Sequence, residues 1–553
     1  MRTGGRILVD QLRLHGVDRI FCVPGESYLA ALDALHDTPE IELVVCRMEA
    51  GAANMAEADG KLTGRPGVCF VTRGPGATHA SIGVHVAFQD STPMLLLVGQ
   101  VPRGHRGREA FQEVDFEAMF APLAKWAHEV RDARALPEAI ARAFAVATSG
   151  RPGPVVLSLP EDVLVEQADV HDAPGPTWPY EADVGAADLA LTRKLLSGAA
   201  RPLVLVGGGV WSAQAAIDLA VWAEASEVPV CTSFRRQSYV DNRSRVYCGY
   251  TGIAMDPALA RRIRDCDVLV ALGTRLGDAA TGGYELLEPP DTGKRLVHVY
   301  PDASELGRVY QPEVGIVASP TAFAAALRGL GPLDPAAWGQ WTEAARADYL
   351  AHLEPGPTPG DVDLVEVMHV LRQRLPEGAI VTNGAGNFSI WAHRFWAFSE
   401  VGTQLGPTNG SMGYGLPAGI AARLRRPDRG VVVFAGDGDF LMTGQELATA
   451  VQYEAPIVVL VFNNAMYGTI RMHQERSYPG RVVGTGLRNP DFAALAHAFG
   501  AHGETVRATS EFEPALERAL EAGVPALIEL QVDPEAIAPQ ETLSGIRRAA
   551  QGD

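Results

Sequence analysis

The chain has 553 residues, of which 47% are hydrophobic and 20% charged, and its formal net charge is −19. This length exceeds a single hydrophobic core and predicts about three or four domains. The acidic balance argues against a nucleic-acid partner, which needs a surplus of Lys and Arg. No apolar run approaches the ~20 residues of a membrane helix, and the first residues lack a signal-peptide core, so we expect a cytoplasmic protein with no membrane partner.

Short runs rich in Val, Ile and Leu alternate with Ala-rich stretches along the chain. Such runs are typical of buried parallel strands with helices on both faces of the sheet. They lie at residues 67–72, 93–99, 154–160, 202–208, 267–273, 295–299, 378–384, 430–438 and 456–464. We therefore predict an α/β protein with three doubly wound domains and parallel sheets.

Two stretches rich in Pro and Gly begin at Asp172 and Glu354 and are typical of linkers. They predict an N-terminal domain at 1–172, a central domain at 186–335 and a C-terminal domain at 360–540. The six cysteines are scattered, and none lies in a C-x-x-C pair. We therefore expect buried reduced thiols rather than a zinc site or a redox pair.

Glu49 follows a β-like run and opens an Ala-rich stretch in the N-terminal third of the chain. By itself, it is a carboxylate in the first turn of a helix, where it stabilises the helix dipole.

Glycine-rich turns follow two later strands, at residues 207–209 and 384–386. Neither completes G-x-G-x-x-G, because Ser212 and Ser389 stand where the last glycine belongs. A nicotinamide nucleotide site is therefore only weakly indicated.

The most informative segment begins at Gly430 and reads as strand, glycine turn, helix and strand. Asp437 and Asn464 each end a strand, and in a parallel sheet both side chains reach the carboxyl edge, where ligands bind. Gly436 and Gly438 permit a tight turn and a close backbone approach. One carboxylate and one amide oxygen suit Mg²⁺, which takes its other ligands from phosphates and water.

The helix of this segment is expected to begin near Gly444. Thr443 and Glu446 have the T-x-x-E spacing of a capping box. The positive end of this helix is expected to face a phosphate group.

The sequence GDG followed by NN at this spacing resembles the thiamine diphosphate signature. The resemblance covers nearly the whole chain and extends to the superfamily of acetohydroxyacid synthases, pyruvate oxidases and 2-oxoacid decarboxylases. It implies a pyrimidine-binding first domain, a central domain that holds FAD in some members, and a diphosphate-binding third domain. It also implies thiamine diphosphate and Mg²⁺, bound between two protomers of a homodimer or homotetramer.

The resemblance assigns roles to individual residues. Glu49 would hydrogen-bond the cofactor's pyrimidine and thereby help the cofactor to lose the proton on C2. The carbonyl group of Gly410 would accept a hydrogen bond from the cofactor's amino group, and Met412 would hold its rings in a bent conformation. Further implied cofactor contacts are Asn387, Gly436, Gly438, Asp439, Tyr467 and Gly468, and the implied metal ligands are Asp437, Asn464 and Met466. A core methionine at 412 and a plain strand–helix turn at 387 are the structural alternatives.

On the substrate side, Glu26 stands where related decarboxylases have an acidic residue that moves protons. A surface carboxylate is the alternative. Phe111 and Gln112 resemble the acetohydroxyacid synthase segment that lines the active site, whereas pyruvate decarboxylases have adjacent histidines there. This difference favours ligation over release of an aldehyde.

Acetohydroxyacid synthases carry a tryptophan where the alignment places His473, which puts the branched-chain role in doubt. Arg471 or His473 would bind a substrate carboxylate, or else be an exposed helix residue. In the central domain, Arg275 resembles an arginine that contacts FAD, but Tyr300 stands where relatives often have an acid. Flavin binding therefore stays open.

The leading functional hypothesis is an acetolactate synthase-like carboligase acting on a 2-oxo acid. A non-oxidative 2-oxoacid decarboxylase or an aldehyde lyase is the alternative among enzymes. A nucleotide- or flavin-binding protein without thiamine chemistry is the alternative of another class, and the presence of Glu49, Asp437 and Asn464 argues against it. The sequence does not identify the substrate, beyond a small 2-oxo acid or aldehyde.

Overall fold

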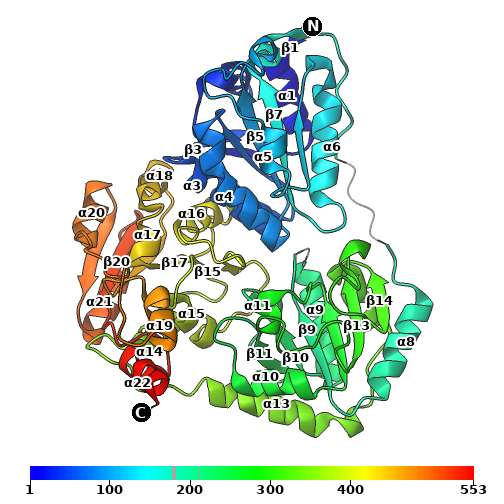
Figure 1. Ribbon diagram of the computed structural model, residues 1–553, viewed down its shortest axis with the longest axis vertical. Helices are drawn as coiled ribbons and strands as arrows, with labels where there is room; N and C mark the ends of the chain where they lie inside the picture. Colours follow the sequence, from blue (N-terminus) through cyan, green and yellow to red (C-terminus); the bar gives the residue numbers. More distant parts are fainter. Residues whose placement is uncertain (177–181, 210, 553) are drawn as a thin grey trace.

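The computed structural model describes residues 1–176, 182–209 and 211–552. Three α/β units follow one another along the chain, and each contains a six-stranded sheet (Figure 1). All neighbouring strands within these sheets are parallel. The predicted fold class, three doubly wound domains with parallel sheets, is confirmed. Part of the first predicted linker, residues 177–181, lies outside the described residues.

The strands are short and buried, as the Val- and Leu-rich runs predict. The sheet of the N-terminal unit contains, in spatial order, β3 (Glu42–Val45), β2 (Arg19–Cys22), β4 (Gly67–Val71), β5 (Met94–Gln100), β7 (Pro154–Pro160) and β6 (Trp126–Glu129). The central sheet contains β11 (Tyr247–Tyr250), β10 (Val230–Thr232), β9 (Pro202–Val206), β12 (Val268–Leu272), β13 (Arg295–Tyr300) and β14 (Val314–Val317). The C-terminal sheet contains β16 (Gln404–Leu405), β15 (Ile380–Asn383), β17 (Val431–Gly436), β18 (Val458–Asn463), β20 (Ala526–Gln531) and β19 (His502–Val506). A separate antiparallel pair joins β1 (Arg2–Thr3) to β8 (Gln167–Ala168).

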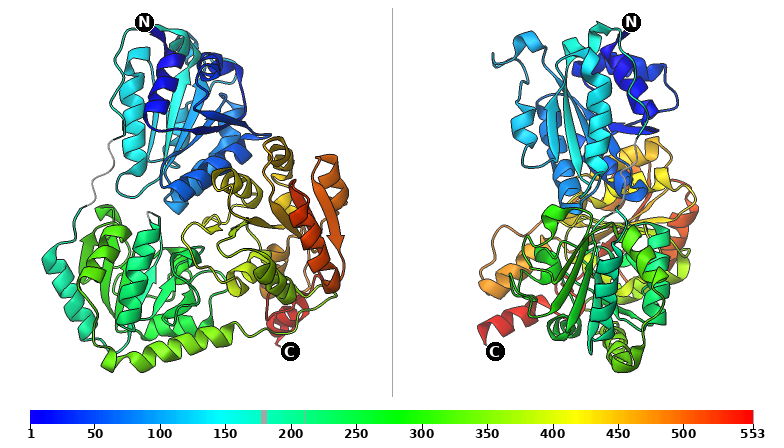
Figure 2. Two further views of the ribbon diagram at one scale, coloured as in Figure 1. Left: turned by 180° about the vertical axis from the view of Figure 1, so that it is seen from behind. Right: turned by 90° about the vertical axis from the view of Figure 1, so that its right-hand side faces the viewer.

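Helices cover both faces of each sheet (Figure 2). The N-terminal unit has α1 (Gly4–Leu14), α2 (Leu29–His36), α3 (Glu49–Thr63), α4 (Pro75–Asp90), α5 (Phe116–Phe120), α6 (Leu136–Thr148) and α7 (Glu161–Val165). The central unit has α8 (Ala186–Ser197), α9 (Ala213–Ala225), α10 (Pro257–Asp265), α11 (Asp278–Thr281), α12 (Pro320–Gly329) and α13 (Gly339–His352). The C-terminal unit has α14 (Leu364–Arg374), α15 (Phe388–Phe395), α16 (Gly415–Arg425), α17 (Asp437–Phe440), the 3₁₀ turn η7 (Gly444–Glu446), α18 (Leu447–Gln452), α19 (Gly468–Ser477), α20 (Phe492–Ala498), α21 (Thr509–Glu521) and α22 (Leu543–Gln551).

Each sheet has a reversal of strand order near its first strand. In the C-terminal sheet, the chain runs from β15 outward to β16 and then returns as β17 on the other side of β15. The loops after β15 and β17 therefore diverge and open a crevice at the carboxyl edge, where open α/β sheets bind ligands. The N-terminal sheet reverses between β2 and β4, and the central sheet between β9 and β12.

The N-terminal and C-terminal units share one hydrophobic core. Helix α3 packs along α16, and both helices are rich in Ala and Gly, which lets their backbones approach closely. Tyr453 of the C-terminal unit accepts the N–H of Val45 (2.7 Å) and donates to the carbonyl group of Leu43 (3.1 Å) at the edge strand β3. These contacts hold the two halves of the chain together.

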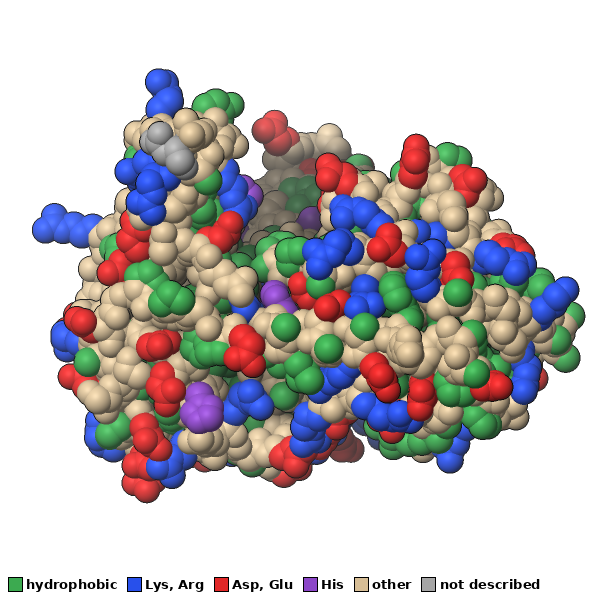
Figure 3. Space-filling view, turned by 90° about the horizontal axis from the view of Figure 1, so that it is seen from below, with side chains coloured by type: hydrophobic (Ala, Val, Ile, Leu, Met, Phe, Trp, Pro, Cys, Tyr) green, Lys and Arg blue, Asp and Glu red, His purple; other side chains and the backbone are tan. Residues whose placement is uncertain are grey.

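Acidic and basic side chains are interspersed over the face seen in Figure 3, so the negative charge is not concentrated in one area there. In the described part of the chain, no helix combines the length and apolarity needed to cross a bilayer. All six cysteine side chains are buried and free of disulfide bonds.

Candidate active site

A cavity of about 300 Å³ lies at the carboxyl edge of the C-terminal sheet, at the reversal between β15 and β17. Its lining contains every residue of this unit that the sequence analysis assigned to the cofactor or the metal. These residues are Asn387, Gly410, Met412, Gly436, Asp437, Gly438, Asp439, Asn464, Met466, Tyr467 and Gly468. The strand reversal thus brings together motifs that are far apart in the sequence.

Asp437 and Asn464 follow two neighbouring strands, because Gly436 pairs with Phe462 in the register of β17 and β18. The Asp437 carboxylate is buried, and its Oδ2 atom accepts the side-chain amide of Asn489 (2.7 Å). Burial raises the pKa of Asp437, and no basic side chain of the described residues offsets this effect. No three His, Cys, Asp or Glu side chains of the described residues gather into a metal cluster. A buried carboxylate beside an amide oxygen fits Mg²⁺, which completes its shell with phosphate and water.

Asn489 is a residue of this site that the sequence analysis missed. Its side-chain nitrogen donates to Asp437 and also to the Oδ1 atom of Asn463 (2.8 Å). Its own Oδ1 atom is buried without a partner among the described residues. The only local signal is the Asn-Pro dipeptide, which predicts a turn and no chemistry.

Asp439 joins two loops of the cavity. Its Oδ1 atom accepts the backbone N–H of Ala385 (3.0 Å) and of Gly413 (2.9 Å). Burial raises the pKa of Asp439 to about 7, although these two hydrogen bonds act in the opposite direction. Asp439 therefore positions the loop after β15 and the loop that carries Gly410, in addition to lining the cavity.

The predicted capping box at Thr443 and Glu446 is wrong. The Thr443 hydroxyl donates to the carbonyl group of Gly413 (2.7 Å), and the Glu446 carboxylate accepts the backbone N–H groups of Arg47 (3.1 Å) and Met48 (2.9 Å). The side chains of Thr443 and Glu446 thus form hydrogen bonds to residues distant in the chain instead of capping the helix. The expected helix start near Gly444 is confirmed, because η7 begins at Gly444 and α18 follows it. A short additional helix, α17, precedes them directly after β17.

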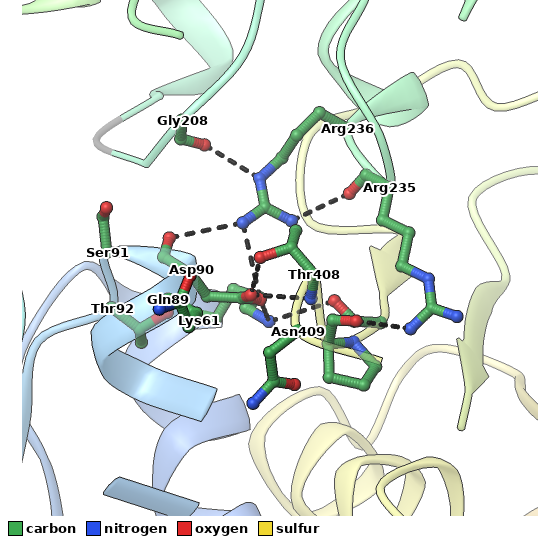
Figure 4. A network of polar contacts seen from close by, with 12 residues as sticks. Lys61, Gln89, Asp90, Ser91, Thr92, Gly208, Arg235, Arg236, Thr408 and Asn409 are labelled. Carbon is green, nitrogen blue, oxygen red and sulfur yellow. Dashed lines mark hydrogen bonds and ion pairs between the residues drawn. The ribbon is translucent and has the colours of Figure 1, made fainter. Parts of the chain in front are cut away.

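Asp90 is the centre of a buried network that joins all three units (Figure 4). Its carboxylate pairs with Lys61 and with Arg236 of the central unit (3.5 Å), and it accepts the backbone N–H of Thr408 (2.7 Å). Burial alone would raise the pKa of Asp90, but the charges of Lys61 and Arg236 hold this pKa at about 2. The network fixes the loop that carries Gly410 against both other units. No local pattern in the sequence marks its members.

Glu49 opens α3 and faces the start of α4, which follows β4 after a short loop. Its Oε2 atom lies 3.0 Å from Nδ1 of His79, and a Cβ atom on Gly76 would lie 3.4 Å from its Oε1 atom. Gln112, with φ +67°, packs against the same loop, since a Cβ atom on Gly74 would come within 2.8 Å of its Cβ. Glu49 therefore contacts the first turns of α4, and Gln112 contacts the loop directly before them.

Glu26 and Phe111 lie at the surface of the same unit. Glu26 pairs with Arg73 (3.0 Å), which also pairs with Glu161 (2.8 Å). Phe111 is 75% exposed. Because aromatic residues are enriched where another molecule covers the surface, this exposure is typical of a contact region.

The two sets of predicted residues do not meet within one chain. Glu49, Glu26, Phe111 and Gln112 are absent from the lining of the cavity in the C-terminal unit. The central unit contributes residues to that lining which the sequence analysis missed, namely Phe234, Arg235 and Ile253.

Three other predicted residues lie apart from the cavity. Arg275 donates to the carbonyl group of Gln89 in the N-terminal unit (2.9 Å). Arg471 pairs with the buried Glu475, and His473 is exposed on α19. None of the three lines the cavity.

Comparison with known families matches three models in chain order. Residues 2–119 match the thiamine pyrophosphate enzyme N-terminal TPP binding domain, residues 189–327 the central domain of these enzymes, and residues 384–530 their C-terminal TPP binding domain.

Curated relatives align over nearly the whole chain. The acetolactate synthase large subunit of Parasynechococcus marenigrum (strain WH8102) is 34% identical over 96% of this chain and 87% of its own length. The acetolactate synthase isozyme 2 large subunit of Escherichia coli (strain K12) is 32% identical over 96% of both chains. The probable acetolactate synthase large subunit of Methanocaldococcus jannaschii is 30% identical over 97% of this chain and 93% of its own length.

Proposed function

We propose that this chain is a carboligase. It belongs to the thiamine pyrophosphate enzymes and, within them, to the acetolactate synthase family. In this proposal it transfers an acyl group from a 2-oxo acid to a second carbonyl compound. The convergence of Asp437, Asn464 and the Gly410 loop on one cavity carries the proposal. Thiamine pyrophosphate, also called thiamine diphosphate, supplies a nucleophilic carbon when it is bound.

Each residue of the chain has a distinct task in this proposal. Asp437 and Asn464, with the Met466 position beside them, hold Mg²⁺, which neutralises the diphosphate. Glu49 holds a proton at the pyrimidine ring. The Gly410 carbonyl group accepts a hydrogen bond from the cofactor, and Met412 supports its rings.

Ligation is favoured over simple decarboxylation by Phe111 and Gln112, which stand where pyruvate decarboxylases have adjacent histidines. We expect the purified protein with Mg²⁺ and thiamine diphosphate to convert a 2-oxo acid into a hydroxy ketone or a hydroxy-oxo acid. The measurement is a screen of donors and acceptors that follows carbon dioxide release and identifies the products. Equal amounts of carbon dioxide and ligated product support the carboligase. Accumulation of free aldehyde without ligated product would instead favour the decarboxylase.

We further propose that each active site forms between two copies of the chain. The support is the separation of Glu49 and its neighbours from the cavity, together with the exposed Phe111 on the N-terminal unit. A second copy would bring its N-terminal unit over the cavity of the first, so a homodimer is the minimum active unit and a homotetramer is compatible with it.

This arrangement predicts complementation between two inactive variants. Glu49→Gln damages only the N-terminal half of a site, and Asp437→Ala damages only the C-terminal half. After subunit exchange, each mixed dimer has one intact site, so random mixing should restore about a quarter of wild-type activity. The control mixes Glu49→Gln with Glu49→Ala, which share the damaged half and should not recover. No recovery after verified exchange, or a fully active monomer at sedimentation equilibrium, would rule out the shared site.

We infer that the central unit does not hold flavin at Arg275 and Tyr300, the residues on which the possibility of flavin rested. The carbonyl group of Gly208, at the strand reversal, accepts hydrogen bonds from Arg236 (2.9 Å) and Tyr239 (2.7 Å). Arg275 bonds to the N-terminal unit, and Tyr300 is buried. The Gly208 carbonyl group and Arg275 are thus engaged with the protein itself.

We therefore expect an enzyme that functions without flavin. A cavity of about 510 Å³ between the three units does lie at this strand reversal, but its lining, which includes Gly209, Trp211 and Tyr239, does not contain Arg275 or Tyr300. The measurement is the visible absorption spectrum of the purified protein, followed by titration with FAD. Stoichiometric FAD uptake would contradict this expectation.

A further inference from the structure

We propose that Arg235 and His393 form a recognition site for the carboxylate group of the substrate, at one end of the cofactor cavity. The inference rests on the proposed function and extends it, because it names the part of the substrate that the protein itself recognises. Both residues line the cavity, and both come from elements outside the thiamine diphosphate motifs.

Arg235 is buried, yet most of its hydrogen-bonding capacity is unused. The residue is 3% exposed, and its Nη1 atom donates to the carbonyl group of Pro407 (2.6 Å). Its Nε atom is buried without a partner among the described residues. A guanidinium group has five N–H donors in a planar fork that matches a carboxylate. Arg235 therefore presents an incompletely paired cation to the cavity.

Two carboxylates, Asp90 and Asp439, lie close enough for their charges to favour the charged form of Arg235, but each has closer partners of its own. Asp90 pairs with Lys61 and Arg236, and Asp439 accepts two backbone N–H groups. No ion pair joins Arg235 to a carboxylate of the described residues. Burial lowers the pKa of Arg235 to about 10, which leaves the group charged at neutral pH. A buried charge without a paired counter-charge is costly, which favours binding of an anion from outside the chain.

The backbone of Arg235 has a strained conformation that directs its side chain toward the cavity. Arg235 has φ +58°, a left-handed conformation that is uncommon for residues other than glycine. This turn separates it from Arg236, which extends toward Asp90 and Gly208, whereas Arg235 extends toward Pro407 (Figure 4). Such strain is concentrated at functional sites, where the surrounding structure maintains it.

His393 adds a second donor or acceptor without adding charge. Its ring lies edge-on to Phe234 and Tyr250, with centroid separations of 6.0 Å. Burial lowers the pKa of His393 well below its usual value, and the positive charge of Arg235 acts in the same direction. Its Nε2 atom is buried without a partner among the described residues. The pair therefore carries a single positive charge, which suits one carboxylate better than a multiply charged phosphate.

Much of the cavity lining is apolar, although the carboxylates of Asp437 and Asp439 also belong to it. Phe234, Ile253, Ile390 and Trp391 line the same cavity. Water is a poor competitor in such surroundings, and an ion pair with a fork-shaped donor is strengthened there. The structure thus favours a 2-oxo acid whose carboxylate meets Arg235 and whose remaining atoms are mainly apolar.

Arg235→Met tests the inference, because methionine keeps an unbranched apolar chain and removes the charge and the fork. The probes are oxamate, an unreactive carboxylate of pyruvate-like shape, and its neutral counterpart oxamide. Binding to the holoenzyme is followed by isothermal titration calorimetry, and thiamine diphosphate binding to the apoprotein is followed in the same way. Arg134→Met, at an exposed arginine paired locally with Asp132, is the matched control.

We expect Arg235→Met to weaken oxamate binding roughly 10- to 100-fold, as for the loss of a charged hydrogen-bonded contact. Oxamide binding and thiamine diphosphate affinity should stay within about twofold of wild type, and Arg235→Lys should recover part of the oxamate affinity. In turnover, KM for the 2-oxo acid should rise more than kcat falls.

If Arg235→Met weakened the binding of oxamate and oxamide equally, the inference would be overturned and Arg235 would have a packing role. Loss of thiamine diphosphate affinity with unchanged oxamate binding would also overturn it and assign the arginine to the cofactor phosphate. If wild type turned over no 2-oxo acid, the proposed function would fail. In that case, wild type could still bind oxamate more tightly than oxamide. Loss of this preference in Arg235→Met would support the anion site. Arg235→Lys keeps the test decisive if Arg235→Met does not fold.

Discussion

Glu49→Gln is expected to bind thiamine diphosphate and Mg²⁺ but to exchange the C2 proton of the bound cofactor about 10²–10⁴-fold more slowly than wild type. This range corresponds to roughly 3–5 kcal/mol of activation free energy. The amide keeps the size of the carboxyl group and removes its ability to hold a transferable proton. The diphosphate anchor at Asp437 and Asn464 is on another unit, so cofactor binding should persist.

The measurement is hydrogen–deuterium exchange at C2 in the holoenzyme, read by NMR after acid quench. Glu42→Gln is the control on the same unit, since the side chain of Glu42 is 44% exposed and paired with Arg19, and its C2 exchange should remain close to wild type. Fold integrity should also be retained, because a carboxylate in the first turn of a helix contributes only about 0.3–1 kcal/mol. Unchanged exchange in Glu49→Gln would reduce Glu49 to a helix-start carboxylate and make Glu26 the next candidate.

Removal of the metal is expected to abolish activity completely. After exhaustive dialysis against EDTA, activity should return only when Mg²⁺ and thiamine diphosphate are both added. Asp437→Ala should remain inactive under the same conditions, because the diphosphate loses the cation that neutralises it. Full activity in protein verified to be free of metal and cofactor would overturn the proposed function.

Asp437→Ala is expected to fold, which separates loss of binding from loss of structure. Burial raises the pKa of Asp437, so the ionised carboxylate is unfavourable in the metal-free protein and its removal should not weaken that state. Thermal unfolding should show a rise in Tm when wild type receives both ligands and no rise in the variant. Asp428→Ala, at an acid whose side chain is 76% exposed before β17, is the matched control and should respond like wild type.

The sequence is sufficient to predict those features that depend on residues close together in the chain. The Val-rich runs around residues 431–436 and 458–463 predict buried parallel strands, and the carboxyl ends of such strands meet at one edge. Asp437 and Asn464 are therefore predictable neighbours, although they lie in different segments. Glu49 at the start of a helix is equally predictable, because a β-like run followed by an Ala-rich stretch requires a helix start there.

Other features of the site depend on contacts between segments that are distant in the chain. Thr443 and Glu446 have the spacing of a capping box, yet Gly413 and the backbone of residues 47 and 48 compete successfully for their side chains. The cluster of Asp90, Lys61 and Arg236 joins three units. No periodicity or short motif can predict such partners, because their proximity results from the packing of whole domains.

The sequence by itself determined the three parallel sheets and the group of residues that meets at the C-terminal crevice, since strand pattern and glycine turns act over a few residues. The family resemblance implied a site shared between protomers, and the tertiary structure agrees with it, because Glu49 is absent from the lining of this crevice within one chain. Only the tertiary structure placed Arg235 of the central unit in the crevice. The physical reason is that burial and pairing of charges depend on which surfaces come together, and this is decided by the docking of domains rather than by neighbours in the chain.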